Sequence, residues 1–204
     1  EQYAVALALV TGEGVQMSAL ACPNLNDALY PIRGGAGTLA VAVRGQGTWA
    51  CSLEGDHFRP LTASRRAYPR LAQLLLSVEA SHTNLDYMAL FRRSLGLEPE
   101  PIRMDSQAKF VVLAAGGGDL IVRLLPKGQP NYRENIWDLA AGALLVEEAG
   151  GRITDLLGKP LDFGAGTTLA NNYGVLASNG LLHDAALEAL RQLGIGRGKP
   201  ARDE

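Results

Sequence analysis

The first quarter of the chain carries two pairs of apolar runs, and each pair is joined by a short segment with two glycines. The joining segments are Thr11-Gly12-Glu13-Gly14 and Arg44-Gly45-Gln46-Gly47. Such segments have the chemistry of hairpin turns, in which glycine adopts backbone angles that other residues avoid. The first quarter is therefore expected to form a meander of antiparallel strands. The expected strands are 3–10, 15–22, 38–43 and 48–52.

Strand and helix patterns alternate through the rest of the chain, which predicts an α/β fold. The expected strands are 74–79, 120–124, 151–154 and 174–177, and the expected helices are 86–95, 106–115, 137–149 and 181–193. We assign residues 1–73 to an antiparallel strand region and residues 74–193 to an α/β subdomain. Residues 194–204 are expected to form a mobile tail, because their glycines and charges bury little apolar surface.

The composition is that of an ordinary globular domain, with 204 residues that are 47% hydrophobic and 20% charged and a formal net charge of −2. This balance gives no reason to expect binding to nucleic acid or to a membrane, so any phosphate must bind to local cationic groups. Cys22 and Cys51 lack the spacing of a zinc site and are expected to be reduced. We expect a cytoplasmic protein with a small-molecule partner, with an organelle as the alternative location.

Asp138 stands at the start of the predicted helix 137–149, whose other early residues are small or apolar. A carboxylate on a rigid element is a suitable oxygen ligand for a divalent cation, so Asp138 is a candidate metal ligand. The alternative is that this carboxylate only complements the positive end of the helix dipole, a stabilisation of about 0.3–1 kcal/mol.

Ser106 and Lys109 lie one turn apart at the predicted start of the helix 106–115. A serine hydroxyl, free backbone N–H groups and a lysine would converge there on one point, which favours a bound anion. The alternative is an ordinary N-cap serine beside a solvated lysine.

His82 and Arg123 are two further candidates for binding a ligand. His82 follows the predicted strand 74–79, where α/β sheets often carry ligand-binding residues, although a loop histidine can also be merely solvated. Arg123 lies between Val122 and Leu124 in an apolar strand, and a buried arginine needs an anionic partner.

Several stretches, in this order, resemble the 3'(2'),5'-bisphosphate nucleotidase branch of the inositol monophosphatase superfamily, which comprises lithium-sensitive, magnesium-dependent phosphatases. The stretches are 2–9, 22–25, 77–79 with His82, 105–109, 136–138 and 160–164. The run Asp-Ser-Gln-Ala-Lys at 105–109 is the discriminating one, because inositol monophosphatases typically place a Gly-Ser-Ala-type segment there. The resemblance therefore points to the nucleotidases within the superfamily.

The resemblance implies a layered α/β sandwich of the sugar-phosphatase type with mixed sheets. It also implies that Asp138 is catalytic, binds Mg2+ and lies near the scissile phosphate. The residues that it implies bind the nucleotide are His82, Ser106, Lys109, Arg123 and Asp138. The implied reaction is hydrolysis of the 3'-phosphate of adenosine 3',5'-bisphosphate, and also of 3'-phosphoadenylyl sulfate, by a metal-activated water. An inositol phosphate or a sugar bisphosphate is the alternative substrate.

The first metal signature of the superfamily, Asp-Pro-apolar-Asp-Gly-Thr, normally precedes the strand that resembles 3–9, and the sequence does not contain it. Mg2+ needs more oxygen ligands than Asp138 alone supplies. We therefore expect the amino-terminal part of the fold to be missing and the chain alone to be inactive, with a non-catalytic nucleotide-binding remnant as the alternative. A sheet without its covering helices would expose an apolar face, so self-association is expected as well.

Overall fold

The computed structural model describes residues 2–78, 85–126 and 128–195. A first five-stranded sheet, here the amino-terminal sheet, is antiparallel throughout and has the order β1-β2-β5-β6-β7. Its strands are β1 (Val5–Thr11), β2 (Gly14–Cys22), β5 (Thr38–Val43), β6 (Thr48–Cys51) and β7 (Arg59–Leu61). A two-stranded ribbon of β3 (Leu25–Asn26) and β4 (Tyr30–Pro31) leaves it between β2 and β5. Both expected hairpins are confirmed.

A second five-stranded sheet, here the carboxy-terminal sheet, is mixed and has the order β11-β12-β10-β8-β9. Its strands are β8 (Leu74–Leu76), β9 (Ile102–Arg103), β10 (Leu120–Arg123), β11 (Arg152–Thr154) and β12 (Val175–Ser178). The pairs of β8 with β9 and with β10 are parallel, whereas those of β12 with β10 and with β11 are antiparallel. The α-helices are α1 (Leu85–Leu95), α2 (Ala108–Ala114), α3 (Ala140–Glu148) and α4 (His183–Gln192), and two short 3-10 helices are η1 (Pro69–Leu71) and η3 (Ile136–Asp138).

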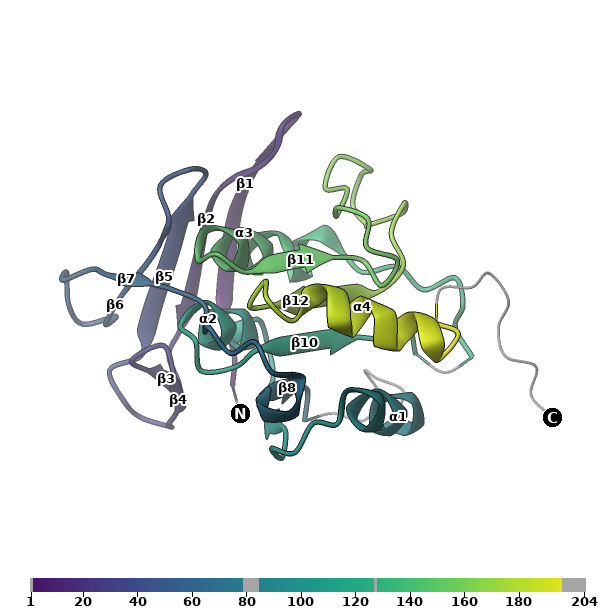
Figure 1. The fold of residues 1–204 in the computed structure, drawn as a ribbon. Helices are drawn as coiled ribbons and strands as arrows, with labels where there is room; N and C mark the ends of the chain where they lie inside the picture. Colours follow the sequence, from purple (N-terminus) through teal and green to yellow (C-terminus); the bar gives the residue numbers. More distant parts are fainter. Residues whose placement is uncertain (1, 79–84, 127, 196–204) are drawn as a thin grey trace.

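The elements stack in four layers (Figure 1). Helices α2 and α3 lie between the two sheets, and α1 and α4 cover the far face of the carboxy-terminal sheet. All residues of α2 and the first seven of α3 are buried, as expected for helices with an apolar layer on each side. Gly142 allows close packing of the two helices, since a Cβ there would lie 2.5 Å from the ring of Phe110. The layered α/β fold is confirmed.

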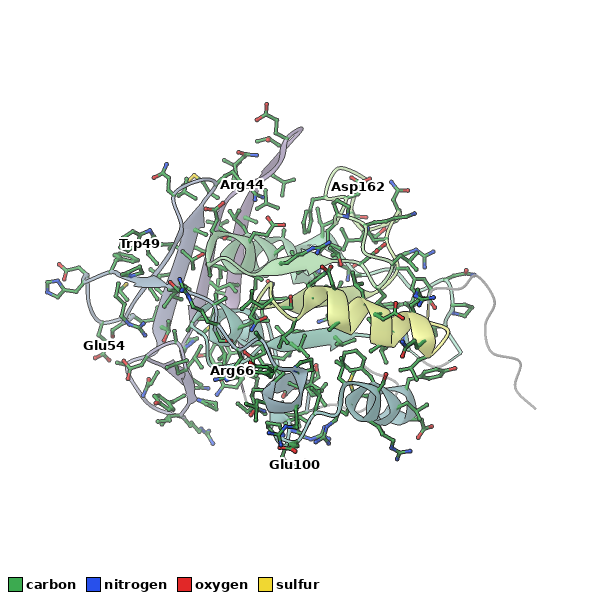
Figure 2. The ribbon with its side chains drawn as sticks, viewed as in Figure 1. Arg44, Trp49, Glu54, Arg66, Glu100 and Asp162 are labelled. Atoms are coloured by element: carbon green, nitrogen blue, oxygen red, sulfur yellow. The ribbon has the colours of Figure 1, made fainter. Side chains whose placement is uncertain are left out.

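The turn between β5 and β6 ties the amino-terminal sheet to the end of α3. Arg44 donates to the Glu147 carboxylate at 2.7 Å, and the N–H groups of Gly45 and Gly47 each donate to Glu148 at 2.9 Å. Figure 2 labels Arg44 at this end of the sheet. These contacts fix the carboxy-terminal end of α3 against the amino-terminal sheet.

Some predicted boundaries are wrong. The expected helix 137–149 is the 3-10 helix η3 followed by α3, which begins only at Ala140. The expected helix 106–115 is the shorter α2, and the expected strand 74–79 ends at Leu76 within the described residues. The predicted division of the chain after residue 73 falls between the strands of the two sheets and stays a prediction. Most of the expected tail, 194–204, lies outside the described residues. Within the described ranges no helix is long and apolar enough to cross a membrane.

The outer face of the amino-terminal sheet is apolar and exposed. Along β1 the side chains of Val5, Leu7 and Leu9 are 65%, 72% and 51% exposed, and Met17 on β2 pairs with Leu9. Trp49 on β6 extends the same face, on the side away from α2 and α3 (Figures 1 and 2). No helix among the described residues covers this face. Contiguous apolar surface of this kind favours association.

We expect this chain to self-associate through that face, and the double substitution Leu7→Lys and Leu9→Lys to shift it to a monomer. Two charges would have to be desolvated in the associated form, which is unfavourable. Light scattering after gel filtration, across a series of protein concentrations, measures the change. Leu181→Lys is the control, because Leu181 is 58% exposed but lies beside α4. A monomeric parent chain at every concentration would contradict the expectation.

His183 is fully buried at the start of α4, between two hydroxyl groups. Its Nε2 lies 2.9 Å from Thr154 Oγ1, and its Nδ1 lies 2.9 Å from Ser178 Oγ. The Thr154 hydroxyl donates to the Asp155 carbonyl, so it accepts from Nε2–H, and Nδ1 accepts from Ser178 in a neutral ring. Burial, assisted by the positive charge of Arg152, lowers the pKa of His183 to about 4.

The free energy of unfolding is expected to fall by up to about 3 kcal/mol, through His183 alone, as the pH drops from about 6.5 to about 4. In this window the unfolded chain binds a proton that the folded protein excludes until about pH 4. Urea unfolding at neutral and at acidic pH measures the loss. His183→Gln should reduce it, and His57→Gln, at a fully exposed histidine, should not. Equal losses in all three proteins would show that His183 does not cause the effect.

Candidate active site

The loop before α2 is held in a specific conformation by hydrogen bonds. Asp105 Oδ1 accepts from the N–H of Val78, two residues after β8, at 3.1 Å. Ser106 has a φ of 59°, which is unfavourable for a residue with a side chain. Its hydroxyl oxygen accepts from the N–H of Ala108 at 3.2 Å. The serine hydroxyl therefore bonds the first N–H of α2, but the N-cap of that helix is Gln107 and not the serine that one sequence interpretation expected. A non-glycine residue in this backbone conformation often marks a functional site.

Lys109 is only 3% exposed. Its Nζ donates to the carbonyl oxygens of Met104 and Ser106 at 3.0 and 2.9 Å, so the interpretation as a solvated lysine is wrong. Burial lowers the pKa of Lys109 to about 8; Arg123 also lowers it, and Asp105 opposes this shift. An ammonium group has three donors, so these two bonds leave one N–H of Lys109 unused.

Gln107 connects this loop to the segment that carries Asp138. Its Nε2 donates to the carbonyl of Trp137 at 2.9 Å, and its Oε1 accepts from the N–H of Gly142 at 3.2 Å. No role for Gln107 was predicted from the sequence, although this residue lies inside the run 105–109 that distinguishes the nucleotidases. The structure therefore places the start of α2 directly against η3 and the first turn of α3.

Asp138 ends the 3-10 helix η3 and precedes Leu139, the N-cap of α3, so its carboxylate does not lie in the first turn of that helix. The side chain is partly buried, and its Oδ2 accepts from Nδ2 of Asn135 at 3.3 Å. The carboxylate is thus held by one neutral donor and has further lone pairs for another partner.

Arg123 has an anionic partner, as the sequence required, and that partner is Glu134. Its Nε and Nη2 donate to the two carboxylate oxygens at 2.9 and 2.7 Å in a bidentate pair. Burial opposes the charge of Arg123, but Glu134 outweighs it and raises the pKa of the guanidinium, and Asp138 acts in the same direction. Tyr132 lies beside the pair, with its hydroxyl 3.5 Å from Glu134. Burial, assisted by that carboxylate, raises the pKa of the Tyr132 hydroxyl.

Two positive groups, Lys109 and Arg123, and two carboxylates, Glu134 and Asp138, thus lie in the region formed by the start of α2, the end of β10 and η3. Lys109 and Arg123 repel each other, and Arg123 attracts Asp138. The predicted candidate His82 lies outside the described residues. Within those residues no group of three or more histidine, cysteine, aspartate or glutamate side chains could hold a metal ion.

Glu134 is the acidic residue that the sequence analysis missed. The signal for it was indirect: Arg123 needed a partner in an apolar strand, and Glu134 lies close to the Ile-Trp-Asp run. Only the fold shows that it meets Arg123 across the segment that joins β10 to η3.

A family model and a curated relative both match nearly the whole chain. The model described as "Inositol monophosphatase family" matches residues 1–194. The 3'(2'),5'-bisphosphate nucleotidase of Schizosaccharomyces pombe is 39% identical over 92% of this chain and 54% of its own length, so the chain spans about half the length of this curated relative.

Solved structures share the fold. The extragenic suppressor protein suhB of Bartonella henselae superposes with a TM-score of 0.66 at 21% identity, over 93% of this chain and 61% of that one. SaIMPase-II, solved with 2'AMP bound, superposes with a TM-score of 0.61 at 19% identity, over 95% of this chain and 66% of that one. At such identities the likeness concerns the fold alone.

Proposed function

This chain belongs to the inositol monophosphatase family, and from that premise we propose that it carries the nucleotide-binding part of a 3'(2'),5'-bisphosphate nucleotidase. The proposed reaction is magnesium-dependent removal of the 3'-phosphate from adenosine 3',5'-bisphosphate, and also from 3'-phosphoadenylyl sulfate. One observation carries the proposal: the charge of Arg123 acts on both Lys109 and Asp138, and Gln107 at the start of α2 bonds the residue before Asp138, so two cationic side chains and a candidate metal ligand lie in one region. The curated nucleotidase relative, at 39% identity, supports this substrate class.

Asp138 fits a magnesium ion as one ligand. Its carboxylate is partly exposed and bonded only to a neutral amide among the described residues, whereas Glu134 is committed to Arg123. Mg2+ is commonly bound by one or two carboxylates, the substrate phosphate and several waters. A bound Mg2+ would supply charge stabilisation of the phosphoryl group and a water of lowered pKa.

The side chains of this chain would bind and orient the substrate. Lys109, with one N–H unassigned, would donate to a phosphoryl oxygen. The Nη1 edge of Arg123 points away from the atoms that bind Glu134 and would donate to a second one. Ser106 would contribute by holding the loop before α2 in its conformation, because its hydroxyl oxygen accepts a hydrogen bond from the N–H of Ala108. Holding the ester in one orientation is itself a large contribution to catalysis.

We further propose that this chain alone is inactive, because no group of three or more possible metal-ligating side chains comes together among its described residues. The test is phosphate release from adenosine 3',5'-bisphosphate with Mg2+. The printed chain is compared with a longer form that includes the Asp-Pro-apolar-Asp-Gly-Thr segment. We expect activity only in the longer form, lost in its Asp138→Asn variant and kept in Asp86→Asn, at an exposed position of α1.

Two other outcomes would decide against the proposal. If the longer form hydrolyses inositol monophosphates but not the nucleotide, the family membership stands and the assigned substrate is wrong. If it hydrolyses neither but binds the nucleotide, the chain belongs to a binding protein without catalysis.

A further inference from the structure

The side-chain amide of Gln107 makes two hydrogen bonds that lie on either side of Asp138. Its Nε2 donates to the carbonyl of Trp137, the residue before Asp138, at 2.9 Å. Its Oε1 accepts from the N–H of Gly142, four residues after Asp138, at 3.2 Å. The backbone that carries the carboxylate is thus held at both ends by one side chain.

Gln107 also supplies a helix cap that α3 does not provide for itself. The first N–H groups of an α-helix have no partner within the helix. Leu139, the N-cap of α3, makes no side-chain capping bond, and the N–H of Gly142 lies in the first turn. Gln107, the residue just before α2, accepts a hydrogen bond from that N–H through its side chain. The start of α3 therefore depends on the start of α2 for its position.

The same residue stands between the groups proposed to bind phosphate. Ser106 precedes it, and Lys109 follows two residues later with Nζ bound to the Ser106 carbonyl at 2.9 Å. A shift of Gln107 would therefore change the position of Asp138 relative to Lys109. We propose that Gln107 is a positioning residue, which sets this relation so that one phosphate can contact both Lys109 and a Mg2+ ion on Asp138. This inference rests on the proposed function.

Only a primary amide of this length can make both contacts, because one atom must donate and the other accept. Glutamate keeps the length and the acceptor but places a negative oxygen against the Trp137 carbonyl. Leucine keeps much of the volume and has neither group. Gln107→Glu and Gln107→Leu therefore break the bridge in different ways.

The experiment is calorimetric titration of the full chain with adenosine 3',5'-bisphosphate, with Mg2+ and with EDTA. The affinity with Mg2+ divided by the affinity in EDTA is here called the Mg2+ gain. It measures how strongly the metal ligand and the phosphate-binding groups cooperate in holding the nucleotide. We expect Mg2+ to strengthen nucleotide binding by the parent chain. In both Gln107 variants the Mg2+ gain should be about tenfold smaller, which corresponds to about 1.4 kcal/mol. Binding in EDTA should change by less than about twofold, since Lys109 is retained.

Phe91→Leu is the matched control for lost stability. Phe91 is fully buried in α1, in the core between the carboxy-terminal sheet and the outer helices, away from the site. Thermal unfolding is measured for all variants. A Phe91→Leu protein that is as destabilised as the Gln107 variants, but keeps the Mg2+ gain, would support positioning over a merely structural role.

The outcomes separate the inference from the function beneath it. A parent chain that does not bind the nucleotide, or binds it without a Mg2+ gain, overturns the proposed site and the role of Gln107 with it. A parent chain with a Mg2+ gain that both Gln107 variants keep overturns only the inference about Gln107.

Discussion

Replacing Asp119 with alanine is expected to lower the free energy of unfolding by about 3–5 kcal/mol, because several donors around this buried carboxylate lose their acceptor and each unsatisfied group costs about 1–3 kcal/mol. The Asp119 side chain is fully buried at the start of β10. It accepts from Arg66 Nη1 at 2.5 Å, from the Gln73 N–H at 2.6 Å and from the Ser64 hydroxyl. A fourth donor, Nδ2 of Asn179, lies 3.4 Å from Asp119 Oδ1.

This network joins the connection between the two sheets to one end of the three central strands of the carboxy-terminal sheet. Ser64 and Arg66 lie between β7 and β8, and Figure 2 labels Arg66 in this region. Gln73 precedes β8, and Asn179 follows β12. One carboxylate thus fixes the linker and the ends of β8, β10 and β12 together, so its loss should loosen the packing of the carboxy-terminal sheet.

Urea unfolding followed by circular dichroism measures the Asp119→Ala effect. Asp184→Ala is the control, because Asp184 also pairs with an arginine, at 2.8 Å, but its side chain is 87% exposed. An exposed pair of this kind contributes at most about 1 kcal/mol. A loss in Asp119→Ala no larger than that of Asp184→Ala would show that the buried network is not a main source of stability.

Lys109→Met is expected to weaken binding of adenosine 3',5'-bisphosphate about 10- to 100-fold, the effect of losing one hydrogen bond from a charged group to a phosphate. Methionine has a similar length and suits the apolar surroundings, so the helix should remain. Lys159→Met, at an exposed lysine of another loop, should leave the affinity unchanged. Calorimetric titration of the three proteins at neutral pH gives the comparison.

The same residue predicts a pH dependence. The pKa of Lys109 is about 8, so nucleotide affinity should fall as the pH rises through about 8, where the ammonium loses its charge. Stability should change in the opposite direction. The unfolded chain keeps this proton up to a pH of about 10.5, so the penalty for burying the charge disappears between the two values. An affinity that is constant from pH 7 to about 9.5 would contradict a phosphate contact by Lys109.

The fold was largely predictable where local chemistry decides it. The glycine segments at 11–14 and 44–47 specify hairpins, and the observed registers join β1 to β2 and β5 to β6 as expected. The short strands β3, β4, β7 and β9 could not be predicted, because two or three residues carry no period and form only against partners far along the chain.

The site was predictable as separate residues but not as an arrangement. The types and positions of Asp138, Lys109 and Arg123 marked them as candidates, and their roles stay predictions. The pairing of Arg123 with Glu134 and the bridge through Gln107 depend on which segments the two sheets bring together. The break between η3 and α3 was also missed, since apolar spacing continues through Leu139 while its backbone leaves the helical path.

The most direct test of the account is a titration of this chain, in the presence of Mg2+, with adenosine 3',5'-bisphosphate and with an inositol monophosphate. The parent protein and Asp138→Asn are compared. We expect the nucleotide to bind at least about tenfold more tightly than the inositol phosphate, and Asp138→Asn to weaken nucleotide binding only when Mg2+ is present. Equal affinity for both ligands, or a variant that binds as tightly as the parent with Mg2+, would contradict the assigned substrate or the assigned metal ligand.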